Sequence, residues 1–279
     1  MYKDEIFIPI GDAVNDLLYN YNKDDCITTG LSSVDEITGG LKNGELVLLA
    51  ARPGMGKTQF SLNIAYNAAK ATGRRSVFFS LEHSTEQISA RALWMLTGID
   101  THKILNRDNS SLDERLQKAA EDLQGVDLLV YDVQPMFDTV ETLIENLKGV
   151  DNLGLIVVDY LQLCSLSRWK SIDRKAESRS ILLVFKRAAK ELGVPVIVVS
   201  QLSRKCESRE DKRPDPFELM IEGLGVLSDD IIFLYKDSYY YGQYDDGSPG
   251  ECMIAQSKDR SSGIALYKLE NNGGRFTDI

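Results

Sequence analysis

The sequence predicts an α/β fold, in which helices cover both faces of a mainly parallel, twisted sheet and antiparallel strands extend its C-terminal end. Two observations carry this prediction. Between residues 46 and 200, short runs rich in Val, Leu and Ile alternate with helical segments, a pattern typical of parallel strands buried on both faces. After residue 200, strand-like runs follow one another with turn-forming stretches between them, which favours antiparallel pairing.

The first element is an amphipathic helix ahead of the main domain. Apolar residues recur at three- to four-residue spacing from Ile10 to Tyr21, which puts them on one helix face. Residues 22–25 are polar and linker-like. We therefore divide the chain into a helix and connector over residues 1–27 and a main domain over residues 28–279.

The main domain begins with a short helix, capped by Ser32 or Ser33, that ends at Gly39-Gly40. The parallel strands are expected at Leu46 to Ala50, Val77 to Ser80, Leu128 to Tyr131, Leu155 to Val158 and Val196 to Val199. The helices between and after them are expected at residues 57–71, 84–97, 111–123, 138–148 and 173–192. Antiparallel strands are expected at Ile231 to Tyr235, Met253 to Gln256 and Ala265 to Leu269. There is no internal repeat.

Composition and charge exclude several classes of protein. With 43% hydrophobic and 27% charged residues, the chain of 279 residues lies in the globular range. The net charge of −10 argues against a surface that binds nucleic acid by charge alone, although residues 168–187 and 203–213 are locally basic. Apolar runs are shorter than the roughly 20 residues of a membrane helix. The four cysteines form no C-x-x-C pair. We expect a cytoplasmic protein with reduced thiols and no membrane partner.

Residues 51–58, Ala-Arg-Pro-Gly-Met-Gly-Lys-Thr, follow a predicted strand and open a helix, the context of a phosphate-binding loop. Gly54 and Gly56 let the backbone curl so that N–H groups point at a β-phosphate. Lys57 is expected to reach the β and γ oxygens, and the Thr58 hydroxyl to coordinate Mg²⁺. The alternative is a glycine-rich turn without a ligand. We expect ATP and Mg²⁺ at a site formed by Ala51, Arg52, Pro53, Gly54, Met55, Gly56, Lys57, Thr58 and Gln59.

Three polar residues at strand ends are candidates for chemistry at this site. Asp159 ends an apolar strand, where its carboxylate would lie beside Thr58 and the metal ion; the alternative is a simple strand end. Glu82 follows the strand Val77 to Ser80, which comes directly after the loop strand in sequence order. It is the expected general base, or else an acid favoured by a helix N-terminus. Gln201 carries an amide suited to sensing a γ-phosphate, or is only a polar loop residue.

The chain resembles the motor domain of the DnaB-type replicative helicases through several strings in the same order and at similar spacings. They are Thr29-Gly30 with Asp35, residues 50–58, Ser80-Leu81-Glu82 with Glu86, Gln87 and Arg91, residues 158–163, residues 194–196 with 200–204, and residues 211–214. The resemblance covers residues 28–276. It implies a RecA-like P-loop NTPase in a hexameric ring, with ATP at each subunit boundary, Arg91 among the nucleotide-binding residues and single-stranded DNA in the central channel.

The resemblance also implies roles for two segments outside the phosphate-binding loop. Lys258 and Arg260 match the family's basic pair, which reaches into the neighbouring subunit's site as an arginine finger; read alone, they would be a solvated turn. The helix from Ile10 to Tyr21 resembles the family's linker helix, which docks on an adjacent motor domain. Its alternative is a helix folded back on its own domain. A helicase loader and a primase are the further partners implied.

Two departures from the family are visible. Family members carry a helical domain before the linker helix, for which we find no room here, and this leaves open the initiator and primase contacts made through it. Where the family has Asp-x-Arg-Glu-Ser-Gly, Met220 stands near the arginine's place and Ile221 near the glutamate's. We therefore expect a main contact with the DNA backbone to be lost.

The favoured function is an ATP-dependent DNA helicase motor that translocates on single-stranded DNA during replication. The first alternative is a RecA-like ATPase without unwinding activity, and the second is a helicase-like regulatory subunit. A strand-displacement assay separates them, because only the first function predicts unwinding.

Overall fold

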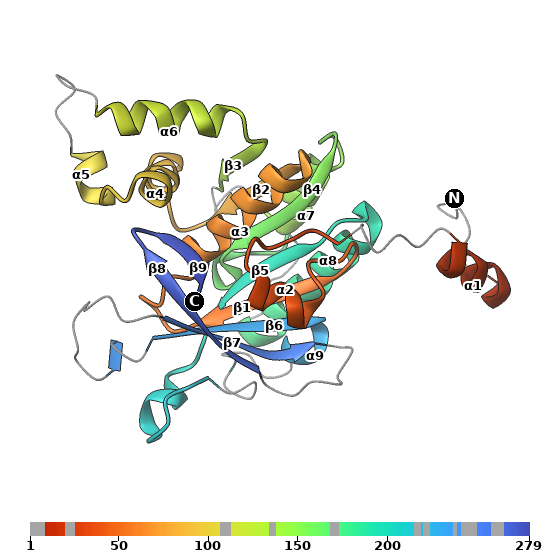
Figure 1. Ribbon diagram of the computed structural model, residues 1–279. Coiled ribbons are helices and arrows are strands. Elements are labelled where there is room, and N and C mark those ends of the chain that lie inside the picture. Colours follow the sequence, from red (N-terminus) through yellow and green to blue (C-terminus); the bar gives the residue numbers. More distant parts are fainter. Residues whose placement is uncertain are drawn as a thin grey trace.

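The computed structural model describes residues 9–19, 26–106, 113–133, 138–167, 173–214, 219, 224–236, 239–240, 250–257 and 265–279. Its centre is a nine-stranded sheet in the order β3-β2-β4-β5-β1-β6-β7-β8-β9 (Figure 1). The strands are β1 (Leu46–Ala51), β2 (Arg75–Ser80), β3 (Leu128–Asp132), β4 (Leu153–Asp159), β5 (Val196–Gln201), β6 (Asp230–Tyr235), β7 (Gly250–Ser257), β8 (Ala265–Asn272) and β9 (Arg275–Asp278).

Helices connect the strands of the parallel part. The α-helices of the described ranges are α1 (Ile10–Tyr19), α2 (Ser32–Thr38), α3 (Lys57–Thr72), α4 (Thr85–Thr97), α5 (Thr101–Leu105), α6 (Glu114–Gln124), α7 (Val140–Leu147), α8 (Arg174–Leu192) and α9 (Leu224–Leu227). Two short 3-10 helices are η2 (Leu161–Leu163) and η3 (Arg204–Ser208). None of these helices combines the length and the apolar character needed to cross a membrane.

The predicted fold class is confirmed, with one correction. Strands β3, β2, β4, β5, β1 and β6 are parallel, and β7 to β9 continue the sheet antiparallel. Residues 231–235 pair antiparallel with β7, as expected, but on their other side β6 runs parallel to β1, with Leu48 opposite Ile231, so β6 is the last parallel strand and not the first antiparallel one. All residues of β6 are buried, as expected for a strand whose two faces are both covered by other elements.

The core has two layers, one on each face of the sheet. In β1, Leu46, Leu48 and Ala50 belong to one apolar cluster, and the alternate residues belong to the other, as the two-residue period of a strand dictates. Phe185 of α8 packs in the first cluster and Phe60 of α3 in the second. Helices α3 and α8 therefore cover opposite faces, and the ends of the central strands are held rigidly between them.

The N-terminal cap of α2 differs from the prediction. Neither Ser32 nor Ser33 caps the helix, whose N-cap position is Leu31 with no side-chain cap hydrogen bond. Instead the Asp278 carboxylate at the end of β9 accepts hydrogen bonds from the backbone N–H groups and the hydroxyls of both serines. A carboxylate at a helix N-terminus is electrostatically favourable, so the last strand holds the first helix of the main domain.

Candidate active site

The turn between β1 and α3 has the backbone of an anion-binding loop. Gly54 and Gly56 adopt positive φ angles of 80° and 88°, a region that is open to glycine and costly for other residues. Gly56 is also the N-cap residue of α3 and provides no side-chain cap. The N–H groups of the first helical turn are therefore available to an anion, and the helix dipole favours negative charge there.

A cavity of about 360 Å³ opens at this loop, at the edge where β1, β4 and β5 end. It brings together most of the residues that the sequence singled out: Pro53, Gly54, Met55, Gly56, Lys57, Thr58, Gln59, Glu82, Arg91, Asp159 and Gln201. Ala51 and Arg52 do not line it. Ala51 is the buried last residue of β1, and the Arg52 side chain turns to Glu207 and to the Leu202 carbonyl oxygen.

Lys57 lies beneath the loop with its ammonium group held by the backbone. Its Nζ donates to the carbonyl oxygen of Arg52 at 3.1 Å. Burial lowers the pKa of Lys57 to about 8, although the nearby Asp159 and Glu82 carboxylates favour its charged form. A bound polyanion would raise this pKa again, because an opposite charge at short range favours the ammonium.

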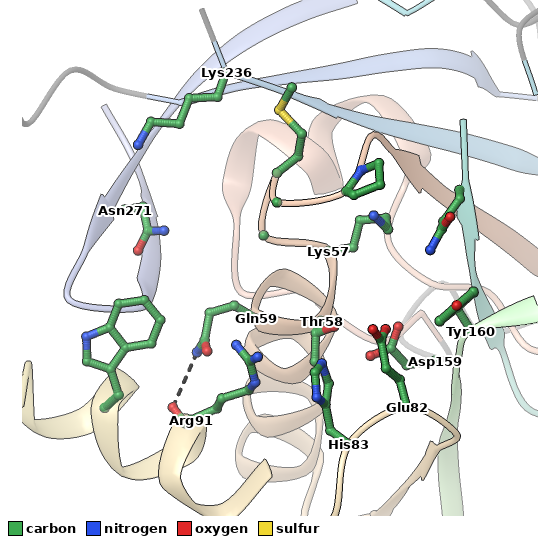
Figure 2. Close-up of a pocket in the computed structure, with 16 residues that line it drawn as sticks. Lys57, Thr58, Gln59, Glu82, His83, Arg91, Asp159, Tyr160, Lys236 and Asn271 are labelled. Atoms are coloured by element: carbon green, nitrogen blue, oxygen red, sulfur yellow. Dashed lines mark hydrogen bonds between the residues drawn. The ribbon is translucent and has the colours of Figure 1, made fainter. Parts of the chain in front are cut away.

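Asp159 and Thr58 face each other across the start of α3 (Figure 2). Asp159 is 1% exposed, and burial raises the pKa of its carboxyl group, against the effects of a hydrogen bond from Thr58 and of the His83 and Lys57 side chains. Within the described part of the chain, its Oδ2 atom has no hydrogen-bond partner. A buried oxygen of this kind, beside a hydroxyl, matches the donor set that Mg²⁺ prefers.

Glu82 lies beside Asp159 in the loop between β2 and α4 (Figure 2). It stands outside the start of α4, where Ser84 is the N-cap residue and forms a capping box with Gln87. The acid in the first turn of that helix is Glu86. The alternative for Glu82 was an acid that the N-terminus of a helix favours. Glu86 occupies that position on α4, whereas Glu82 lines the cavity.

Gln201 is the last residue of β5 and not a loop residue. Its side chain hydrogen-bonds with Tyr160, which follows Asp159. Its backbone N–H donates to Gln162 Oε1 at 3.3 Å, and Gln162 Nε2 donates to Ser200 Oγ at 2.9 Å. The ends of β4 and β5 are thus joined by amide contacts behind the cavity.

Gln59 and Arg91 connect α3 to α4 on the other side of the loop. Gln59 Nε2 donates to the Arg91 carbonyl oxygen at 3.4 Å, a contact drawn in Figure 2. Burial lowers the pKa of Arg91, and Asp159 and Glu82 oppose that effect. A guanidinium that faces these carboxylates across a cavity can pair with an anion placed between them.

Five lining residues were missed by the sequence analysis: His83, Trp94, Tyr160, Lys236 and Asn271. His83 and Tyr160 are the chain neighbours of Glu82 and Asp159, so adjacency was a usable signal. Trp94 follows Arg91 by three residues on α4, a spacing that puts both on one face. No signal in the sequence pointed to Lys236 and Asn271. Their positions at the cavity depend on the parallel direction of β6 and on the return of β8 to the loop.

Four residues expected at the site or along the DNA path lie outside the described residues. They are Met220, Ile221, Lys258 and Arg260. Their expected roles remain predictions.

Comparison with known proteins identifies the family. The family model for the DnaB-like helicase C terminal domain matches residues 26–278. The replicative DNA helicase DnaB of Geobacillus stearothermophilus is 34% identical over 265 residues, covering 93% of this chain and 58% of that protein. The replicative DNA helicase DnaC of Bacillus subtilis (strain 168) is 32% identical, covering 91% of this chain and 56% of that protein. The chain therefore spans little more than half the length of these relatives.

Solved structures agree with this result. The ATPase domain of G40P superposes with a TM-score of 0.84 at 29% identity and covers 97% of this chain and 99% of that one. A DnaB-like replicative helicase, described with its interactions with primase, has a TM-score of 0.84 at 27% identity and covers 99% of this chain and 68% of that one. The RadB recombinase, with a TM-score of 0.57 and 19% identity, shares the RecA-like fold. The resemblance read from the motifs is thus confirmed, and the chain belongs to the DnaB-like helicase C-terminal domain family.

Proposed function

We propose that this chain is the motor of a replicative DNA helicase, which hydrolyses ATP at the subunit interfaces of a ring and translocates on single-stranded DNA. One observation carries the proposal. Lys57, Thr58, Glu82, Asp159 and Gln201 come from separate segments and line one cavity at the carboxyl edge of the sheet. The family and the relatives support the same function.

The phosphate chain of ATP would be held by the N–H groups of residues 54–58 and by the Lys57 ammonium. Mg²⁺ would be held by Thr58 and Asp159, whose buried Oδ2 atom fits such a ligand. When bound there, Mg²⁺ neutralises charge on the phosphate oxygens. Arg91 and Gln59 would face the phosphates from α4 and α3.

Glu82 would act as the general base. It would take a proton from the water molecule that attacks the γ-phosphorus, while the bond to the β-γ bridging oxygen breaks and ADP and phosphate leave. Gln201 would report the presence of the γ-phosphate, because the chain leads directly from this last residue of β5 through Ser203 to η3. A further cation would be supplied across the interface, and we assign this role to Lys258 and Arg260 of a neighbouring subunit.

The ring would be closed in part by α1. Figure 1 shows this helix away from the sheet, and Ile10 and Leu18 are 81% and 67% exposed. An apolar helix face of this kind needs a cover, which we propose is the motor domain of the next subunit. Deletion of residues 1–22 should reduce the assembly to smaller species in light scattering. An unchanged mass would show that α1 does not hold the ring.

Single-stranded DNA would contact the segment 204–213, called the basic segment below, where Arg204 and Lys205 are exposed. A helicase loader or a primase is a further proposed partner, and pull-down with purified primase tests it directly. The cytoplasmic location expected from the sequence stays a prediction.

Strand displacement on a forked duplex with ATP tests the function. The wild-type chain should separate the strands, and Lys57→Ala should abolish both unwinding and hydrolysis, since the cation under the phosphates is gone. Lys70→Ala is the matched control, because Lys70 lies exposed in the last turn of the same helix. ATP hydrolysis without displacement would favour the non-unwinding ATPase, and neither activity would favour the regulatory subunit.

A further inference from the structure

The cavity has a second end, away from the carboxylates, that the proposed phosphate chemistry does not use. Lys236, Asn271 and Trp94 are among the residues that line the cavity, and Gly274 contacts both Trp94 and Asn271. In Figure 2, Asn271 and Lys236 lie on the opposite side of the loop from Glu82 and Asp159, and Gln59 and Arg91 lie between the two groups. A ligand whose phosphates lie at Lys57 would therefore carry its remaining part toward this end.

Trp94 has one side packed against protein and another facing the cavity. It packs beside the small apolar cluster of Ala90, Ile104 and Leu116. A Cβ atom on Gly274 would lie 2.6 Å from the Cδ2 and Cε3 atoms of Trp94, so that glycine packs directly against the indole. The side chain is nonetheless only half-buried and lines the cavity. Part of the indole is thus held by protein contacts, and another part lines the cavity.

The turn between β8 and β9 that supports Trp94 is itself fastened to α3. Asn63, buried on α3, donates from Nδ2 to the Gly274 carbonyl oxygen at 2.9 Å and accepts from the Phe276 N–H at 3.1 Å. The Gly274 N–H donates to Asn271 Oδ1 at 3.0 Å. These contacts hold the Asn271 amide in one orientation, which leaves its NH₂ group to donate to a ligand.

We infer that Trp94 is the stacking platform for the base of the nucleotide and that Asn271 contacts the base edge or the ribose beside it. The inference rests on the proposed ATP site, and it deepens that proposal by naming the nucleoside end and the preferred ligand class. An immobilised indole stacks on any base, but it covers more of a purine than of a pyrimidine. The site should therefore prefer purine nucleoside triphosphates.

Two ligands separate this inference from the proposed function. ATP carries both the base and the phosphates, whereas inorganic tripolyphosphate carries only the phosphates. In calorimetric titrations with Mg²⁺, Trp94→Ala should weaken ATP binding about 10- to 100-fold, the range that base stacking on an aromatic side chain supplies, and leave tripolyphosphate binding unchanged. Trp94→Phe should recover most of the lost affinity. The ratio of the affinities for ATP and CTP should be smaller in Trp94→Ala than in the wild type.

Fluorescence gives a second readout. The chain has two tryptophans, so Trp169→Phe leaves Trp94 as the sole indole reporter. Saturating ATP should change its emission, and tripolyphosphate should not. Equal ATP affinity in wild type and Trp94→Ala, or no emission change with bound ATP, overturns the inference while the phosphate site stands. If the wild type binds neither ligand, both the inference and the proposed function fail.

Gly274→Ala tests the support of the platform. The new methyl group would collide with the indole and displace it, so the variant should lose ATP affinity as Trp94→Ala does and keep tripolyphosphate binding. Gly73→Ala is the matched control, because Gly73 also has a positive φ, of 63°, but a Cβ there meets no atom within 4 Å. Equal ATP affinities in the two glycine variants would contradict the support assigned to Gly274.

Discussion

Arg52 of the phosphate-binding loop and Glu207 of η3 form an ion pair that joins the nucleotide cavity to the basic segment. Arg52 Nε donates to Glu207 Oε1 at 2.8 Å, and another nitrogen of the same guanidinium donates to the Leu202 carbonyl oxygen at 2.8 Å. The Arg52 side chain is 11% exposed, so solvent screens this pair less than an ordinary surface pair. The loop that would bind phosphate and the segment that would bind DNA are therefore in direct contact.

Glu207→Gln should uncouple the two sites. Glutamine keeps the size of the side chain but removes the charge that holds Arg52, so ATP affinity should persist while stimulation of ATP hydrolysis by single-stranded DNA falls. Glu191→Gln is the matched control, because it breaks the exposed pair with Arg187 on α8. Hydrolysis rates with and without oligonucleotide check the outcome, and equal stimulation in both variants would show that the ion pair carries no coupling.

Glu82→Gln should bind ATP with unchanged affinity and hydrolyse it about 10² to 10⁴ times more slowly, since the amide keeps the shape of the side chain but cannot accept the proton. Glu86→Gln, an exposed acid at the start of α4, should hydrolyse ATP normally. Single-turnover measurements of the ATP hydrolysis rate in the two variants test this prediction. Normal turnover in Glu82→Gln would move the general base to another residue.

Asp278→Asn should destabilise the fold by about 1.5–3 kcal/mol at pH 7, the range for hydrogen bonds to a charged group. Burial alone would raise the pKa of Asp278, but the hydrogen bonds from Ser33 and Ser32 outweigh it and lower the pKa. A lowered pKa gives a stabilisation that is complete above the ordinary value of about 3.9 and is lost as the pH falls through the folded-state value. The difference between variant and wild type should therefore shrink below about pH 4.

Urea unfolding at pH 7 and at pH 3 measures this effect. Glu270→Gln removes the same charge from the neighbouring strand β8 and should change stability little. A penalty for Asp278→Asn that stays constant from pH 7 to pH 3 would mean that the charge of Asp278 does not hold α2.

The sequence was sufficient for those parts of the site that lie within one segment. The loop from residue 51 to residue 58, the strand ending in Asp159 and the position of Glu82 each combine a strand, a turn and a polar residue in local order. Parallel strands bring their carboxyl ends to one edge, so local order also predicted that these residues meet. The structure brings them together at one cavity.

The nucleoside end could not be predicted in the same way. Trp94 and Gly274 are far apart in sequence, and their contact depends on the return of β8 and β9 past α3. The direction of β6 relative to β1 was also misread, because an apolar run has the same pattern in a parallel and in an antiparallel pair. The side chain of Arg52 left the cavity for Glu207, a tertiary contact that no loop motif encodes.

Arg260→Ala should reduce hydrolysis by about 10³ or more, the contribution of an arginine finger, while ATP binding to isolated subunits stays nearly unchanged. Mixing Arg260→Ala with Lys57→Ala subunits tests the action across the interface. Some boundaries in mixed rings join an intact phosphate loop to an intact finger, so part of the activity should return. No recovery at any ratio, in rings shown to co-assemble, would contradict a finger in trans.

Affinity for single-stranded DNA should have a shallow salt dependence in the wild type, because Met220 cannot pair with a phosphate and few contacts release few counterions. Met220→Arg should make log affinity steeper against log salt by about one unit for each phosphate contact regained, and hydrolysis should respond more strongly to DNA. Fluorescence anisotropy at several salt concentrations measures both slopes. An unchanged slope in Met220→Arg would show that this position does not reach the DNA backbone.

The same titration tests the basic segment, because the side chains of Arg204 and Lys205 are exposed on η3 beside the Arg52–Glu207 pair. Replacing both with glutamine should lower the slope by about one unit for each phosphate contact removed. Arg187→Gln removes one positive charge from an exposed site on α8 and should leave the slope unchanged. If the double variant and this control have the same slope, Arg204 and Lys205 make no phosphate contacts of their own. If the slope falls only in the double variant, the segment that contacts DNA is the one held by the phosphate-binding loop.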